Sequence, residues 1–169
     1  MELQPMSTAR IDFQDCDPFG HLNNTKYLNY MMNARTEHLR DFYGFDVYEH
    51  TEKTGNAWLV TKSRIAYYLP VTFNKKVLLE TQLIYADQRR AMPQCIMYSE
   101  DKSLMHAILW VEFIYVDTRT GKPKKHEADL QNLLDQITVN KNKKIDELNF
   151  DETVKTISSN FRKSRNDNK

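Results

Sequence analysis

The spacing of hydrophobic residues predicts one long helix in the first third of the chain. Between residues 25 and 43 apolar side chains recur every three or four positions, which places them on one face of an amphipathic helix. Asn23 or Asn24 can cap the start of this helix, and Gly44 can supply the left-handed residue that ends it. The face that this spacing defines consists of Tyr27, Leu28, Met31, Ala34, Arg35, His38 and Phe42.

The pattern then changes to the alternation of apolar and polar residues that is typical of β-strands. Residues 45–54 are polar and irregular, and we expect no regular element there. The connections between the strands are short, so we expect consecutive strands to be antiparallel neighbours. The predicted strands are a short one at 7–13, before the helix, and four after it, at 58–69, 76–85, 93–99 and 103–116.

The last predicted strand has two different faces. One face is wholly apolar and should receive the helix; it consists of Met105, Ala107, Leu109, Val111, Phe113 and Tyr115. The opposite face is more apolar than a solvated sheet surface should be, and it consists of Leu104, His106, Ile108, Trp110, Glu112 and Ile114. We therefore expect a second subunit or the C-terminal segment to cover it.

The order of these elements predicts an α+β fold, a curled antiparallel sheet wrapped around one long central helix. The predicted domain comprises residues 1–137 and ends with a short helix at 127–137. Residues 138–169 are rich in Lys, Asn and Asp, so we expect a polar C-terminal extension that is partly helical, at 151–159, or disordered.

Composition excludes several classes of function. The 169 residues fit one domain, and 24 basic against 23 acidic residues give a net charge of +1, which argues against nucleic acid or an anionic membrane as partner. Cys16 and Cys95 form neither a disulfide framework nor a metal-binding motif. Four scattered glycines provide no phosphate-binding or dinucleotide loop. With neither a signal peptide nor a transmembrane segment, we expect a soluble, cytoplasmic protein without cofactor or metal.

Polar groups concentrate just before the long helix, in residues 15–24. Asp17 precedes a Pro-x-Gly turn, and a partly shielded carboxylate there can act as nucleophile or as general base for water. The helix N-terminus offers unpaired backbone N–H groups that can polarise a carbonyl oxygen. The alternative is that Asp15 or Asp17 only caps the turn.

The same stretch resembles a known enzyme family. Asp-x-Asp-Pro-x-Gly-His-x-Asn-Asn at residues 15–24, followed by Tyr27, Tyr30 and Ala34-Arg35, is similar to the hot-dog-fold acyl-CoA thioesterases of the 4-hydroxybenzoyl-CoA thioesterase type. The similarity extends over roughly residues 7–135 and includes the later strands in the family's order. It implies the hot-dog fold and hydrolysis of a thioester.

The resemblance also assigns roles to individual residues. Asp17 matches the family's catalytic aspartate, acting as nucleophile or as general base, and the N–H of Asn24 falls where the family holds the thioester oxygen. His21 is either an auxiliary catalytic residue or a structural hydrogen-bonding one. Arg89 and Arg90 lie where the family binds the phosphates of CoA, although adjacent arginines can equally form a solvated turn.

The expected partner is an acyl-CoA substrate. In the family two subunits pair edge to edge with the acyl group between them, so we expect a dimer or tetramer. Two other functions stay open, a thioesterase for acyl groups on a carrier protein and a non-catalytic acyl-binding protein. Arg35, on the apolar side of the helix, is expected to be a buried charge that requires a partner rather than a substrate ligand.

Overall fold

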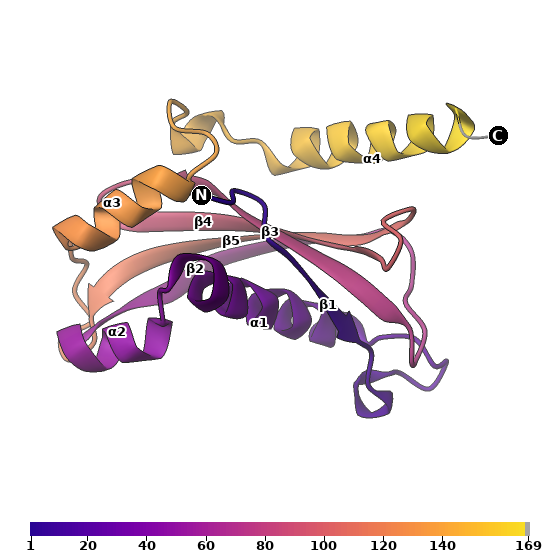
Figure 1. Cartoon of the computed structure of the whole chain (residues 1–169), viewed down its shortest axis with the longest axis horizontal. Coiled ribbons are helices and arrows are strands. Elements are labelled where there is room, and N and C mark those ends of the chain that lie inside the picture. Colours follow the sequence, from indigo (N-terminus) through magenta and orange to yellow (C-terminus); the bar gives the residue numbers. More distant parts are fainter. Residues whose placement is uncertain (168–169) are drawn as a thin grey trace.

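A computed structural model describes the backbone of residues 1–167 and the side chains of residues 1–161. Its centre is a five-stranded antiparallel sheet in the order β1-β3-β4-β5-β2. The long helix α1 lies on one side of this sheet, and α4 runs along the other side (Figure 1). The strands are β1 (Met6–Arg10), β2 (Asn56–Tyr67), β3 (Lys76–Ala86), β4 (Arg90–Ser99) and β5 (Met105–Asp117). The helices are α1 (Asn24–Tyr43), α2 (Val47–Thr54), α3 (Ala128–Ile137) and α4 (Phe150–Asp167), with single 3₁₀ turns at Phe13–Asp15 and Ile145–Glu147.

Helix α1 forms where its hydrophobic spacing predicts. Asn23 is the N-cap, since its side-chain oxygen accepts a hydrogen bond from the Thr25 N–H at 3.0 Å. Gly44 ends the helix with a φ of 65°. The side chains buried against the sheet are Tyr27, Met31, Ala34, Arg35 and His38. The predicted α+β fold class, a curled antiparallel sheet around one central helix, is confirmed by this architecture.

Helix α2 was not predicted, because residues 45–54 carry too few apolar side chains to show a helical period. Its start is set instead by Asp46, whose carboxylate accepts from the N–H groups of Tyr48 and Glu49 at 2.8 and 3.0 Å. Gly55 ends it in the left-handed region. Local capping therefore forms a helix of two turns where periodicity gives no signal.

The expectation that consecutive strands are neighbours is wrong for the strands at 58–69 and 76–85. Strand β2 pairs with β5, at the far edge of the sheet from β1. The segment between β2 and β3 is not a hairpin turn, because it pairs with the loop that precedes α1. The Leu22 N–H donates to the Val71 carbonyl at 2.7 Å, and the Phe73 N–H donates to the Gly20 carbonyl at 3.0 Å.

The C-terminal segment covers the face of the sheet that is remote from α1. Phe150 packs edge-to-face on Trp110 with ring centroids 5.4 Å apart, and Tyr98 stacks on Phe161 at 5.2 Å. Helix α4 is also longer than the helix expected at 151–159. We expected either a second subunit or the C-terminal segment to cover this face, and the C-terminal segment does so.

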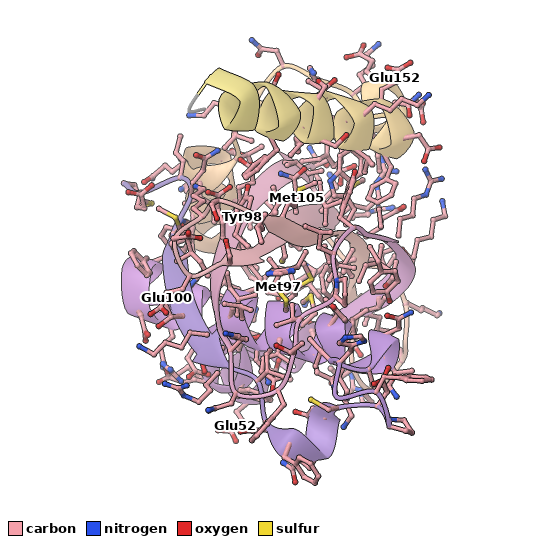
Figure 2. The ribbon with its side chains drawn as sticks, turned by 90° about the vertical axis from the view of Figure 1, so that its right-hand side faces the viewer. Glu52, Met97, Tyr98, Glu100, Met105 and Glu152 are labelled. Atoms are coloured by element: carbon pink, nitrogen blue, oxygen red, sulfur yellow. The ribbon has the colours of Figure 1, made fainter. Side chains whose placement is uncertain are left out.

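The two faces of the sheet separate neighbouring residues of β4. In Figure 2, Tyr98 and Met105 lie on the α4 side of the sheet, whereas Met97 lies towards α1. Strict alternation along β5 predicts that Met105 faces the central helix, and this is wrong. Met105 faces α4 because the register shifts beside it, between Met97 and Tyr98.

Candidate active site

The loop before α1 is a short antiparallel hairpin that folds back on itself. Cys16 and Leu22 form an isolated β-bridge, and the Asp17 N–H donates to the His21 carbonyl at 2.7 Å. Gly20 adopts a φ of 76°, a conformation that favours glycine. This turn holds Asp17 close to the first residues of α1.

The Asp17 carboxylate is half-buried and fixed by only one of its oxygens. Its Oδ1 accepts hydrogen bonds from the N–H groups of Phe19 and His21 at 2.9 and 3.0 Å. Within the described part of the chain, Oδ2 has no hydrogen-bond partner. The turn-capping role expected as the alternative is therefore present, but it occupies one oxygen and leaves the other available.

The neighbouring polar groups of the loop are unsuited to reaction. Asp15 accepts from the Tyr30 hydroxyl at 2.9 Å and forms an ion pair with Lys26 at 3.0 Å, which ties the loop to α1. The hydrogen bond from Lys26 and then that from Tyr30 hold the pKa of Asp15 below its usual value. Burial, followed by the charges of Asp17 and Asp15, raises the pKa of the Cys16 thiol, so it stays protonated.

The start of α1 leaves one backbone donor free next to this loop. The Asn23 cap takes the Thr25 N–H, and the Lys26 N–H donates to the Asn23 carbonyl at 2.8 Å. The Asn24 N–H has no partner among residues 1–167. The Asn24 carbonyl accepts from the Tyr67 hydroxyl at 2.9 Å, which connects the helix start to strand β2.

His21 is held through its backbone. Its N–H donates to Asp17 Oδ1, and it forms a β-bridge with Thr72. No hydrogen bond of its imidazole is found among the described side chains. The auxiliary role of the ring therefore stays a prediction.

Arg89 and Arg90 lie at the turn between β3 and β4 and differ in their surroundings. Asp87 holds Arg90, whose Nε and Nη2 lie 2.8 and 2.7 Å from Asp87 Oδ2. The Arg89 side chain is exposed and makes no hydrogen bond or ion pair with the described side chains. Both line a shallow hollow of about 550 Å³ together with Lys125. Lys125 is far from this turn in sequence, and no local motif points to its presence there.

Within one chain, the arginine pair and Asp17 lie at opposite ends of the sheet. The loop that carries Asp17 contacts the start of β3, where the Ile11 N–H donates to the Lys75 carbonyl at 3.0 Å. The arginines follow the end of β3, which is 11 residues long, or roughly 35 Å at ~3.3 Å per residue. The pantetheine arm of CoA is shorter than this separation, so one chain does not bring the two predicted parts of the site together.

No helix among the described residues is long and apolar enough to cross a membrane. Nor do the described side chains include a group of three or more His, Cys, Asp or Glu residues that could hold a metal ion.

The arrangement of sheet and helices is similar to that of solved thioesterases. The DHNA-CoA thioesterase from Staphylococcus aureus superposes with a TM-score of 0.73 at 18% identity, covering 79% of this chain and 90% of the other. A Staphylococcus aureus protein, SAV2348, solved in complex with CoA, gives a TM-score of 0.71 at 12% identity, covering 82% and 86% of the two chains. These likenesses confirm the predicted hot-dog fold.

Sequence comparison gives the family. A sequence model of the thioesterase-like superfamily matches residues 11–134, and the chain belongs to this family. The long-chain acyl-CoA thioesterase FadM of Escherichia coli is 22% identical over 121 residues, which are 72% of this chain and 89% of FadM. The predicted family is confirmed, and a thioester hydrolase is the class of enzyme that the family indicates.

Proposed function

We propose that the protein hydrolyses an acyl-CoA thioester to the free acid and CoA, with Asp17 as the reacting carboxylate. The observation that carries this is an anchored carboxylate beside the start of a helix, where Asp17 Oδ2 and the Asn24 N–H both have no partner among the described residues. The carboxylate supplies a nucleophile or base. The N–H and the helix dipole stabilise negative charge on the thioester oxygen.

Two routes are open to Asp17. In the first, Oδ2 attacks the thioester carbonyl, the C–S bond breaks to release the CoA thiolate, and water then hydrolyses the mixed anhydride. In the second, Oδ2 takes a proton from a water molecule that attacks the same carbon, and the C–S bond then breaks to release the free acid and the CoA thiolate, which takes up a proton. In both, the Asn24 N–H donates to the carbonyl oxygen as it gains charge.

Thiol release from a panel of acyl-CoAs tests the assignment. Asp17→Asn keeps the acceptor oxygen for the turn but removes the reactive carboxylate, so we expect kcat to fall on the order of 10²-fold or more. Asp12→Asn, at an exposed aspartate five residues earlier, is the matched control and should leave kcat unchanged. Full activity of Asp17→Asn, or no thiol release by the wild type, would contradict the proposal.

We further propose that two copies pair through strand β2 to complete the site. The apolar face around Trp110 does not support self-association, because the C-terminal segment covers it. Support comes instead from the free edge of β2, where Leu59 and Val60 are 51% and 57% exposed. A long unpaired edge with apolar side chains is a template for pairing with another strand.

Antiparallel pairing of two β2 strands about their middle would bring the separated parts together. Arg90 of β4 pairs with Ile114 of β5, and Ile114 pairs with Leu59 of β2. The arginines therefore lie level with the N-terminal end of β2. Tyr67, which contacts Asn24, lies at the C-terminal end of β2. In the pair, the arginines of one copy would therefore lie beside the helix start of the other.

Light scattering tests this pairing. Val60→Lys replaces an exposed apolar side chain near the centre of the free edge with a charge, next to those of Lys62 and Arg64, and we expect it to yield monomers with little activity. Leu3→Lys, at an exposed residue outside the sheet, is the control and should remain a dimer. A wild-type protein that is monomeric at working concentration would refute the pairing.

Arg89 is the residue we propose for the CoA phosphates, since its guanidinium has no partner among the described side chains whereas that of Arg90 is held by Asp87. Arg89→Ala should raise KM for acyl-CoA and leave hydrolysis of a short acyl-pantetheine thioester unchanged. Arg119→Ala, an exposed arginine in another turn, is the control. Equal effects on both substrates would argue against recognition of the CoA nucleotide by Arg89.

A further inference from the structure

A second pocket lies between the sheet and three helices, away from Asp17. It has a volume of about 150 Å³ and is lined by apolar side chains apart from Arg35 and Thr36. Figure 1 shows α2 and α3 at the same end of the sheet, which is where α1 ends. Arg35 lies roughly 16 Å along α1 from Asn24, at ~1.5 Å per residue. The residues that define its walls include Met32, Leu39, Trp58, Phe113 and Leu134.

Arg35 is a buried cation without a counter-ion in this pocket. Its side chain is only 5% exposed, and its Nη1 has no hydrogen-bond partner among the described residues. No ion pair of Arg35 occurs in the described part of the chain. An arginine keeps its charge at any pH a protein meets, and a buried charge is costly unless it is paired.

The titratable groups around Arg35 do not supply a negative charge. Burial raises the pKa of the Cys95 thiol to about 12, and it also raises the pKa of Tyr43, whose hydroxyl is a polar neighbour of the guanidinium. Both groups are therefore neutral at pH 7. The Tyr43 hydroxyl donates a hydrogen bond to the Glu2 backbone carbonyl at 2.8 Å. No described side chain therefore compensates the charge of Arg35, contrary to the partner that we expected for it from the sequence.

The pocket and the charge together define a ligand. A largely apolar cavity of about 150 Å³ accommodates a molecule of the size of benzene. The planar fork of a guanidinium matches the two oxygens of a carboxylate. We propose that this pocket binds a small apolar carboxylate, of the size of benzoate or hexanoate, with Arg35 as its counter-ion. Two sources share this chemistry, a free carboxylic acid and the terminal carboxylate of a dicarboxylic acyl group.

Equilibrium binding tests the site without any hydrolysis. Benzoate and hexanoate are titrated into the purified protein by calorimetry or ligand-observed NMR, beside their neutral counterparts benzyl alcohol and hexanol. We expect the acids to bind. The alcohols should bind at least about tenfold more weakly than the acids, or not detectably. If the alcohols bind as well as the acids, or if neither acid binds, the proposal is wrong.

Three variants locate the binding. Arg35→Met keeps an unbranched apolar stem but removes the guanidinium and its charge, and it should weaken acid binding by about tenfold or more. Arg40→Met, at an exposed arginine of the same helix, should not change it. Leu133→Trp fills the pocket from α3 while Arg35 stays in place, so it should also abolish binding, which keeps the test valid should Arg35→Met not fold. Unchanged binding in a folded Arg35→Met or Leu133→Trp protein would overturn the assignment.

A kinetic comparison separates the two sources. This arm alone rests on the proposed thioesterase activity and on the proposed β2 pairing, which would place the pocket beside the helix start of the second copy. If the pocket receives the end of the acyl group, Arg35→Met raises KM for adipoyl-CoA and leaves KM for hexanoyl-CoA unchanged. If it receives the free acid, the two KM values keep their ratio and hexanoate still binds the wild type. A protein without thioesterase activity would still bind the acids in the titrations, so failure of the proposed function and failure of the pocket give different results.

Discussion

The buried histidine of the central helix should make the stability of the protein depend on pH. His38 is 1% exposed, and its ring nitrogens lie 2.8 Å from Thr81 Oγ1 and 2.9 Å from Ser7 Oγ. Burial, and after it the positive charge of Arg35, lowers the pKa of His38 from 6.5 to about 4. As the pH falls, the unfolded chain therefore takes up this proton before the folded protein does.

The sign and size of the effect follow from this difference. Stability conferred by neutral His38 is fully present above pH 6.5 and is lost as the pH falls towards 4. The difference between the two pKa values corresponds to about 3 kcal/mol of the free energy of unfolding. About 2 kcal/mol of this is lost between pH 7 and pH 5. We expect urea unfolding of the wild type to show this loss relative to His38→Gln, which keeps a hydrogen-bonding side chain but cannot titrate.

Comparison with the variant isolates His38 from the other histidines. Burial also lowers the pKa values of His50, His106 and His126, so the wild type loses stability in acid for several reasons. These three residues are present in both proteins, and their effects cancel in the difference. If the free energies of unfolding of the two proteins fall in parallel between pH 7 and pH 5, His38 is not held neutral by the fold.

Further predictions concern the packing and the cap that hold the site in place. Phe150→Ala removes a 6% exposed ring from the contact with Trp110 and should lower the free energy of unfolding by about 3 kcal/mol, whereas Phe13→Ala, at a 76% exposed ring, should change it by less than about 0.5 kcal/mol. Removal of residues 142–169 should expose the outer face of the sheet, seen as increased binding of a hydrophobic dye and as larger species in light scattering; an unchanged monodisperse protein would contradict the covering role of α4. Asn23→Ala should cost about 1 kcal/mol in thermal unfolding through loss of the cap on α1, and Asn23→Asp should restore it.

The fold was predictable where the sequence carries a strong period. The spacing of Met31, Ala34 and His38 defines the central helix, and the alternation along β5 defines its two faces. Helix α2 was not predicted because it is short and half-exposed, which leaves its N-cap, Asp46, as the main signal in the sequence. The strand order was also not predicted. Pairing between β2 and β5 depends on tertiary packing and not on the length of the connection between β2 and β3.

Asp17 could be proposed from the sequence because its motif is local, and the residues that shape the motif are neighbours in sequence. The separation of Asp17 from Arg89 could not be predicted, since a local motif does not indicate where a distant turn lies in the sheet. Arg35 shows a different limit. Its position on the buried face of α1 was evident, but the missing counter-ion becomes apparent only when the surroundings of the side chain are known.

The separation of the parts of the site argues for the dimer more strongly than the free edge alone. If one chain were sufficient, CoA bound at Arg89 would leave its thioester far from Asp17, because β3 spans roughly 35 Å. The proposed antiparallel pairing at β2 would remove this conflict without any change within the chain. It would also place the Trp58 wall of the Arg35 pocket beside the helix start of the second copy, because Trp58 lies at the first end of β2. Disruption of the edge by Val60→Lys should therefore abolish turnover of acyl-CoA while hexanoate binding at Arg35 persists, and loss of both together would mean that the pocket itself needs the second copy.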